Sequence, residues 1–190
     1  FRKKVVSYSV ENIVKHPVWK MGKKISVDSA TMMNKGFEYI EAHYLFDIPY
    51  ENIDIIIHQQ SIIHSLVEFQ DNSILGLFSE PDMRIPISYA LMYPARMQLS
   101  VKRLDLTKLN KISFYEPDYK KFPLLKLILD YAKVSPSYII AINAANEVAV
   151  EMFINKKINF EKIGYIIKKT IKNHKKKKIF SIEDIFEIDR

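Results

Sequence analysis

Apolar positions in the last third of the chain recur every three or four residues, which is the spacing of amphipathic helices. Small residues recur within the longest helical pattern of this part, at Ala141, Ala144, Ala145 and Ala149. Because small side chains let helices approach closely, the pattern predicts a helical bundle. The expected helices are residues 124–133, a segment from Ser135 or Ser137 to about Phe153, residues 161–173, and a short helix that Ser181 with Asp184 begins.

The earlier part of the chain adds further helical patterns. A long one ends near Phe46, after a polar stretch in which Asp28, Ser29 and Thr31 can each act as the N-cap. Its apolar residues recur at helical spacing, which predicts one buried face. Shorter helices are expected at residues 10–15 and 85–92.

Strand patterns occupy the middle of the chain. Residues 53–57 form a short apolar run between turn-like residues, which predicts a buried strand. Residues 62–70 and 73–79 flank Asp71 and Asn72, and this pair tolerates the positive φ of a tight turn. The two segments therefore predict a hairpin.

Together these patterns predict an α+β fold. A mixed α/β portion with a small sheet and a hairpin is expected at residues 1–94, and an α-helical domain at residues 120–190. Residues 95–119 show weak periodicity, so we interpret them as a connecting segment.

Composition excludes several classes of site. The chain of 190 residues has no cysteine, which excludes a disulfide scaffold, a cysteine-ligated zinc site and a thiol nucleophile. Its four glycines are far apart, which excludes a glycine-rich dinucleotide or phosphate loop within this chain. No apolar run is long enough to cross a bilayer, so no membrane partner is expected.

The net charge of +7 raises the alternative of a nucleic-acid-binding module. Such a module would gather lysines and aromatic residues on one surface, whereas here the lysines are dispersed along the chain. The densest run, residues 175–178, fits a solvated end of a helix. A second alternative is a purely structural or oligomerisation fragment.

The strongest candidate for chemistry lies within residues 28–41. On a helix, Asn34, Lys35, Glu38 and Glu41 would share one face, with Ser29 near the helix start. A hydroxyl, an amide, an ammonium group and helix N–H groups can hold a phosphate, and a carboxylate one turn further can bind Mg²⁺ or Mn²⁺. The alternative is an amphipathic helix with a solvated Lys–Glu face.

Other motifs allow weaker interpretations. The loop around Trp19, the only tryptophan, could close over a ligand or could simply anchor a connection. His58 and His64 lack the helical spacing of a metal pair, so core or supporting roles fit them better.

Several motifs, in order along the chain, closely resemble those of the 1-deoxy-D-xylulose 5-phosphate reductoisomerase family. They are HPVWKMG at residues 16–22, KISVDSATMMNKG at residues 24–36 followed by Glu38, QSIIHS at residues 60–65, PDMRIP at residues 81–86 and NAANE at residues 143–147.

The resemblance implies an enzyme of isoprenoid precursor biosynthesis. Such an enzyme rearranges 1-deoxy-D-xylulose 5-phosphate, a small phosphorylated sugar, and reduces the product with NADPH to 2-C-methyl-D-erythritol 4-phosphate. The implied cofactors are NADPH and a divalent metal, Mg²⁺, Mn²⁺ or Co²⁺. Residues 1–94 would then be part of the catalytic domain, and the N-terminal NADPH-binding domain would be absent from this chain. A homodimer in the bacterial cytoplasm, with no nucleic-acid partner, is also implied.

The resemblance also implies roles for individual residues. Glu38 would ligate the metal and would be catalytic together with Lys35 and His16. Neighbours of NADPH would be Met21, Gly22 and Met83. Substrate would be held by His16, Trp19, Ser29, Asn34, Lys35 and Glu38. His64 would lie close to the site in a role that the resemblance does not fix.

Overall fold

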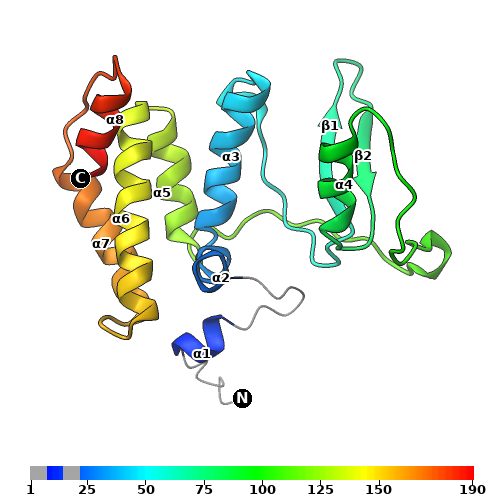
Figure 1. Ribbon diagram of the computed structural model, residues 1–190, viewed down its shortest axis with the longest axis horizontal. Coiled ribbons are helices and arrows are strands. Elements are labelled where there is room, and N and C mark those ends of the chain that lie inside the picture. Colours follow the sequence, from blue (N-terminus) through cyan, green and yellow to red (C-terminus); the bar gives the residue numbers. More distant parts are fainter. Residues whose placement is uncertain (1–7, 15–21) are drawn as a thin grey trace. The chain divides into compact units, whose positions relative to one another are not determined.

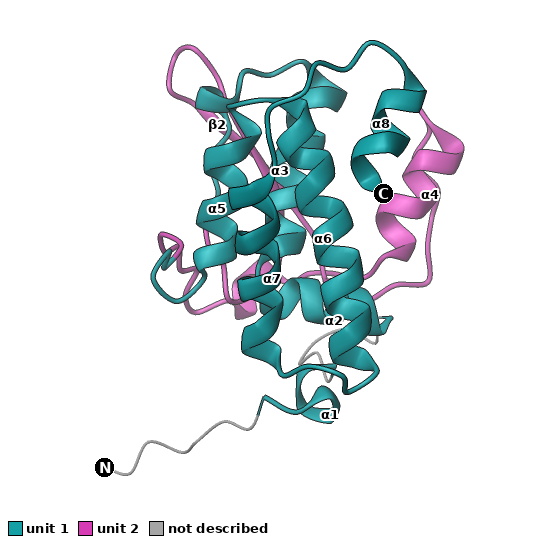
Figure 2. Ribbon diagram, turned by 90° about the vertical axis from the view of Figure 1, so that its left-hand side faces the viewer, with its two compact units in different colours: residues 1–55, 118–190 teal, residues 56–117 magenta. Residues whose placement is uncertain are grey.

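The computed structural model describes residues 8–14 and 22–190 (Figure 1). The chain forms two compact units, shown in different colours in Figure 2. Unit 1 combines the residues up to Ile55 with Asp118–Arg190, and unit 2 is the intervening segment Ile56–Pro117. These units differ from the domains expected from the sequence, at residues 1–94 and 120–190. The expected domain division stays a prediction.

Unit 1 is helical. Within it α3 packs on α5, and α6 packs on α2, α5, α7 and α8 (Figure 1). Its elements are α1 (Val10–Ile13), α2 (Lys23–Ala30), α3 (Met33–Phe46), the 3₁₀ turn η1 (Tyr50–Asn52), α5 (Pro123–Ala132), α6 (Pro136–Ile154), α7 (Phe160–Asn173) and α8 (Ile182–Asp189).

The apolar periodicity explains how these helices pack. On α6, Ala141, Ala145 and Ala149 are all buried, as expected for a stripe of small residues at a close helix contact. On α7 the buried stripe is Ile163, Ile167 and Ile171. Both stripes contribute to one hydrophobic core that continues into α2, α3 and α5.

Polar caps fix the helix ends. The N-cap of α6 is Ser135 rather than Ser137, and its hydroxyl accepts from the Ser137 amide. Ser181 and Asp184 form a capping box at the start of α8, as the sequence predicts.

The longest helix, α6, passes the length and composition test for a membrane span. In unit 1, however, it packs against four other helices. It also buries the side chains of Ser137 and Asn146 completely, and both form hydrogen bonds within the unit. This packing is that of a core helix.

Unit 2 holds a two-stranded antiparallel sheet of β1 (Ile63–Glu68) and β2 (Ile74–Phe78), followed by α4 (Arg84–Met92). The hairpin is confirmed, and Asn72 in its turn has a φ of 65°. Residues 95–117 contain only the short 3₁₀ turn η2 (Leu106–Lys108) and an isolated bridge from Ile57 to Tyr115. The predicted α+β class is confirmed.

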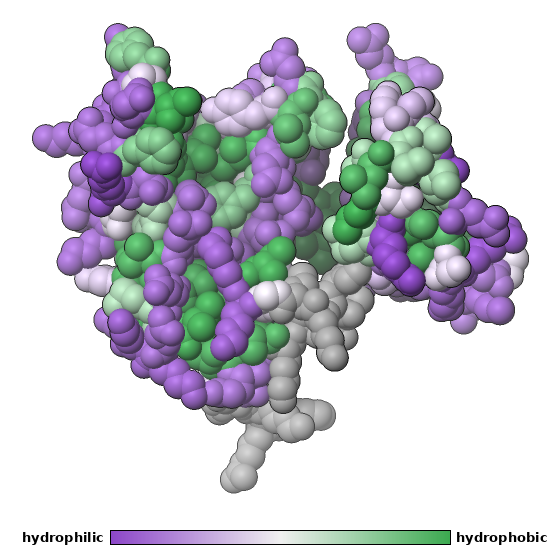
Figure 3. Space-filling view, in the orientation of Figure 1, coloured by the Kyte–Doolittle hydropathy of each residue, from purple (hydrophilic) through white to green (hydrophobic). Residues whose placement is uncertain are grey.

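Unit 2 exposes much apolar surface, part of which is visible over α4 in Figure 3. Ile62 is its one buried large hydrophobic residue. Exposed large hydrophobics occur on both strands and on α4, among them Leu66, Val67, Ile74, Leu75, Leu77, Ile87 and Leu91.

One predicted element is wrong. Residues 53–57 do not form a strand, and within the described chain only Ile57 pairs, through the bridge to Tyr115. An apolar run becomes a strand only when another strand offers its backbone groups along the whole run. The partner here offers a single residue.

Candidate active site

The candidate site is built on the corner between α2 and α3. The Thr31 hydroxyl lies 3.2 Å from the Val27 carbonyl oxygen and 3.1 Å from that of Asp28, and it accepts from the Met33 amide at 3.3 Å. Met32 takes the left-handed conformation, with a φ of 59°. The corner is thereby closed by local hydrogen bonds before α3 begins.

This corner changes the expected place of the cap residues. Asp28 and Ser29 lie inside α2, and Thr31 follows its last residue, so none of them is the N-cap of α3. The α2 pattern is weak in the sequence because Val27 is the only apolar residue that this helix buries. Ser29 therefore lies at the end of one helix, with Asn34 and Lys35 in the first turn of the next.

On α3, Asn34 and Lys35 both converge on Glu38. The Asn34 side-chain amide donates to Glu38 Oε1 at 2.7 Å, and Lys35 Nζ forms an ion pair with Glu38 Oε2. The side chains of Lys35 and Glu38 are 46% and 44% exposed, so a ligand can reach both. The predicted shared face is confirmed for these three residues.

The electrostatics of this helix start favour an anion. The first turn of α3 contains no acidic residue and carries the Lys35 ammonium group. Free N–H groups at a helix N-terminus add partial positive charge at the same place. A phosphate group would be stabilised here by both contributions.

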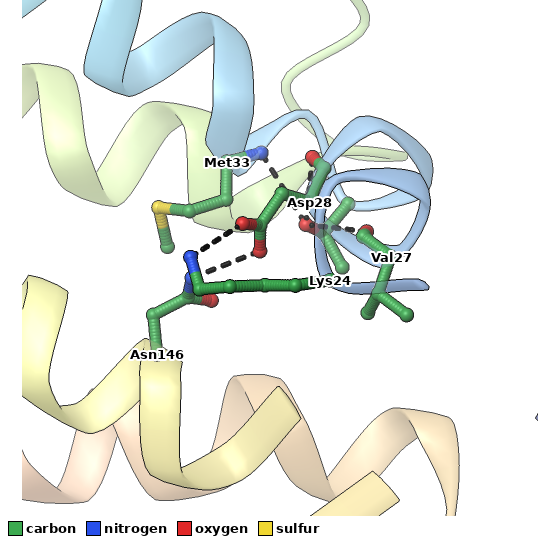
Figure 4. A network of polar contacts seen from close by, with 6 residues as sticks. Lys24, Val27, Asp28, Met33 and Asn146 are labelled. Atoms are coloured by element: carbon green, nitrogen blue, oxygen red, sulfur yellow. Dashed lines mark hydrogen bonds and ion pairs between the residues drawn. The ribbon is translucent and has the colours of Figure 1, made fainter. Parts of the chain in front are cut away.

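A buried polar network lies beneath the corner (Figure 4). Asp28 is 3% exposed, and its two carboxylate oxygens accept from Lys24 Nζ and from the Asn146 side-chain amide, each at 2.9 Å. Asn146 belongs to α6 and is fully buried. The sequence pattern offers Asp28 only as an N-cap and misses its place at the centre of this network.

A complete metal site is not formed by the described residues, because they contain no group of three or more His, Asp or Glu side chains placed to hold an ion. Glu38 offers one exposed carboxylate, which is a suitable ligand for Mg²⁺ or Mn²⁺. The residues present fit one part of such a site.

The remaining predicted site residues belong to other segments of the sequence. His16, Trp19 and Met21 lie outside the described residues. Gly22 is exposed at the N-cap of α2. Met83 belongs to unit 2, where it precedes α4 and is 56% exposed.

His64 also belongs to unit 2. Its Nε2 atom lies 3.1 Å from the Ser79 carbonyl oxygen, a contact that ties β1 to the segment after β2. This contact assigns His64 a structural partner and no chemical role.

Comparison with protein families gives two matches. A family described as the DXP reductoisomerase C-terminal domain matches residues 78–190. A second, described as the 1-deoxy-D-xylulose 5-phosphate reductoisomerase C-terminal domain, matches residues 2–46.

Among curated relatives, the 1-deoxy-D-xylulose 5-phosphate reductoisomerase of Halothermothrix orenii is 47% identical over 188 residues, which cover 99% of this chain and 49% of that protein. The enzyme of the same name from Bacillus subtilis is 47% identical over 190 residues, covering 100% of this chain and 50% of the relative. The chain thus spans about half the length of the curated relatives it matches.

Solved structures agree with these matches. The reductoisomerase from Zymomonas mobilis in complex with NADPH has a TM-score of 0.85 and 46% identity, covering 95% of this chain and 46% of that one. A DOX-P reductoisomerase in complex with NADPH, fosmidomycin and magnesium has a TM-score of 0.89 and 43% identity, covering 95% of this chain and 47% of that one.

Proposed function

The chain belongs to the family of the DXP reductoisomerase C-terminal domain, and we propose that it supplies the substrate-binding and C-terminal part of a 1-deoxy-D-xylulose 5-phosphate reductoisomerase. The proposed reaction is the NADPH-dependent rearrangement and reduction of 1-deoxy-D-xylulose 5-phosphate to 2-C-methyl-D-erythritol 4-phosphate. Because the chain spans about half of its relatives, the activity is proposed for this chain joined to the other half.

One observation carries the proposal. Asn34, Lys35 and Glu38 converge on an accessible face at the start of α3. We assign Lys35 and the helix N-terminus to the phosphate group of the substrate, with Asn34 and Ser29 as neutral donors beside it. Anchoring the phosphate uses binding energy away from the reacting carbons to orient them.

Glu38 is assigned to the divalent metal, which would stabilise negative charge on the substrate oxygens. Two of the matched structures contain magnesium together with fosmidomycin. The other metal ligands would come from outside the described residues. In this chain the amide of Asn34 and the ammonium group of Lys35 hold the Glu38 carboxylate in place.

NADPH would supply the hydride, and this chain would only border it. Gly22 and Met83 are accessible, which supports their assignment as cofactor neighbours. The assignments of Met21 to the cofactor, of His16 to the phosphate side, and of Trp19 to a lid that excludes water remain predictions. A location in the bacterial cytoplasm likewise stays a prediction.

We further propose a homodimer formed through the hairpin of unit 2. Both faces of this two-stranded sheet carry exposed apolar side chains, for example Leu75 and Ile74, at 63% and 61% exposure. A surface of this kind in a folded protein is usually covered by a partner. Sedimentation of the longer protein would contradict this proposal if it gave the monomer mass at micromolar concentration.

A chimera tests the proposed reaction. This chain replaces the matching half of the Bacillus subtilis reductoisomerase, and NADPH oxidation is followed with and without 1-deoxy-D-xylulose 5-phosphate and Mg²⁺. Turnover that requires both additions is the expected result. A chimera that folds and binds NADPH but does not oxidise it under these conditions would contradict the proposal.

A further inference from the structure

Within the described residues, one buried side-chain hydrogen bond joins α2, at the proposed substrate site, to α6 of the helical bundle. The side-chain amide of Asn146 on α6 donates to Asp28 Oδ1 on α2 at 2.9 Å, across 118 positions of sequence (Figure 4). Both side chains are buried, at 0% and 3% exposure. A carboxylate only accepts hydrogen bonds, so the Asn146 amide must present its NH₂ group to Asp28.

A shift of Asp28 would also move every proposed substrate-binding residue of the corner, because all of them are connected to Asp28 through the chain or through Thr31. Ser29 follows Asp28 in the chain. The carbonyl oxygen of Asp28 lies within hydrogen-bond distance of the Thr31 hydroxyl. The same hydroxyl accepts from the amide of Met33, the first residue of α3. Asn34 and Lys35 follow directly.

Apolar packing does little to fix the position of α2 on the other helices. The helix has eight residues and buries Ser26, Val27 and Asp28, of which one is apolar. The charged partner of Asp28 is Lys24, whose side chain is 46% exposed. Because Lys24 lies on the same helix, this ion pair cannot fix α2 relative to α6. Among the residues that the structure describes, the Asn146–Asp28 hydrogen bond is therefore the directional contact that fixes α2 relative to α6.

We infer that Asn146 is a positioning residue of the substrate site, acting through Asp28 on the place of Ser29, Asn34 and Lys35. This inference rests on the proposed function of that site. A carboxylate left buried without its amide partner moves toward water or draws other donors to it. Either response shifts the end of α2 and the start of α3, which hold the substrate.

The first test is Asn146→Ala in the chimera with the Bacillus subtilis half. We expect kcat/KM for 1-deoxy-D-xylulose 5-phosphate to fall about 10–100-fold with a raised substrate KM, the range found when a supporting partner is removed. The KM for NADPH should stay within about twofold. A merely structural role would reduce the amount of active enzyme and lower the apparent kcat, leaving the substrate KM unchanged.

The matched control is Asn143→Ala on the same helix. It makes the same change in helix propensity, and no hydrogen bond of the Asn143 side chain occurs within the described residues. Its substrate KM should equal that of the parent. An Asn146→Ala variant whose substrate KM also equals that of the parent would overturn the inference, even with a lower Tm.

An exchange variant covers the case in which Asn146→Ala does not fold. Combining Asp28→Asn with Asn146→Asp reverses the hydrogen bond, since the amide then donates from α2 to a carboxylate on α6. Each single substitution should raise the substrate KM, and the double variant should recover at least part of it. A double variant no better than the worse single variant would contradict the inference.

Binding of fosmidomycin, a ligand of two matched structures, separates this inference from the proposed reaction. Its Kd, measured by calorimetry with NADPH and Mg²⁺, should rise about tenfold or more in Asn146→Ala and stay unchanged in Asn143→Ala. Unchanged Kd values in both would overturn the role of Asn146 whether or not turnover is seen. Loosened binding without turnover would keep that role and reject the proposed reaction.

Discussion

A Cβ atom on Gly36 of α3 would lie 2.1 Å from the Cγ2 atom of Ile128 on α5. Gly36 lies between Lys35 and Glu38 in the sequence. Gly36 is buried, whereas the side chains of Lys35 and Glu38 are accessible. The absence of a side chain at this position thus lets α3 pack directly on α5 while its other face carries the proposed site. This close contact holds α3 to the helical core, and the corner hydrogen bonds join the start of α3 to the end of α2.

Gly36→Ala should destabilise the chain. The added methyl group would overlap Ile128, which is fully buried, and overpacking of this kind costs about 1–3 kcal/mol. Because the overlap is severe, at 2.1 Å, we expect a cost toward the upper end of this range, and the gain in helix propensity of about 1 kcal/mol offsets only part of it. Urea unfolding of the variant and the parent would measure the difference.

Gly164→Ala on α7 is the matched control, because its Cβ would meet Leu124 only at an ordinary distance of 3.8 Å. This variant should be as stable as the parent or up to about 1 kcal/mol more stable. In a double-mutant cycle, Ile128→Ala should cancel much of the Gly36→Ala penalty, since it removes the overlapping atom. Strictly additive effects would contradict the proposed steric cause.

Tyr50→Phe should remove a loss of folding stability that occurs at alkaline pH. Burial raises the pKa of Tyr50 to about 12, from an ordinary value of 10.0. The unfolded chain then loses this proton first, so the stability contributed by the neutral tyrosine is complete below pH 10 and is lost as the pH rises toward 12.

The measurement is the difference in unfolding free energy between the parent and Tyr50→Phe from pH 7 to pH 11. The Tyr50 hydroxyl is buried without a hydrogen-bond partner in the described part of the chain, so the variant should be no less stable at pH 7. Above pH 10, the unfolding free energy of the variant should rise relative to that of the parent. A difference that does not change with pH would contradict the assigned pKa.

For His174 we predict a loss of folding stability at acidic pH instead. Burial, with the nearby Lys177 charge, lowers the pKa of His174 below its usual 6.5, and its Nε2 atom lies 3.2 Å from the buried Ser137 hydroxyl. The unfolded chain therefore binds a proton here first as the pH falls. The stability from neutral His174 is present above pH 6.5 and is lost below it.

His174→Gln should flatten this part of the pH dependence, because the side-chain amide can still contact Ser137 but does not titrate. Thermal unfolding at pH 7.5 and pH 5 would measure it, with the loss between these values smaller in the variant than in the parent. An equal loss in both proteins would show that His174 does not contribute.

Strong local periodicity made much of the fold predictable. The stripes on α6 and α7, the capping box at Ser181 and the turn at Asn72 follow from local chemistry, and each is observed. The face shared by Asn34, Lys35 and Glu38 could likewise be predicted, because side chains three and four residues apart on a helix are neighbours.

The corner before that face could not be predicted in the same way. Met32, an apolar residue in a left-handed conformation, gives no turn signal, and the weak pattern of α2 concealed that Asp28 and Ser29 end a helix of their own. Besides Lys24 on its own helix, Asp28 is paired with Asn146, 118 positions away, and only the tertiary fold brings these two together. The strand expected at residues 53–57 failed for a related reason, since strand formation depends on a distant partner.

The central claim, that the accessible face of α3 serves a metal-dependent reaction, is tested most directly by Glu38→Gln in the chimera. Glu41→Gln, one turn further along α3 and exposed, is the matched control. Mn²⁺ affinity by calorimetry and NADPH oxidation with 1-deoxy-D-xylulose 5-phosphate are measured for both. We predict that Glu38→Gln weakens metal binding and lowers turnover by about 10–100-fold or more, while Glu41→Gln changes neither. Metal affinity and turnover unchanged by Glu38→Gln would contradict the claim.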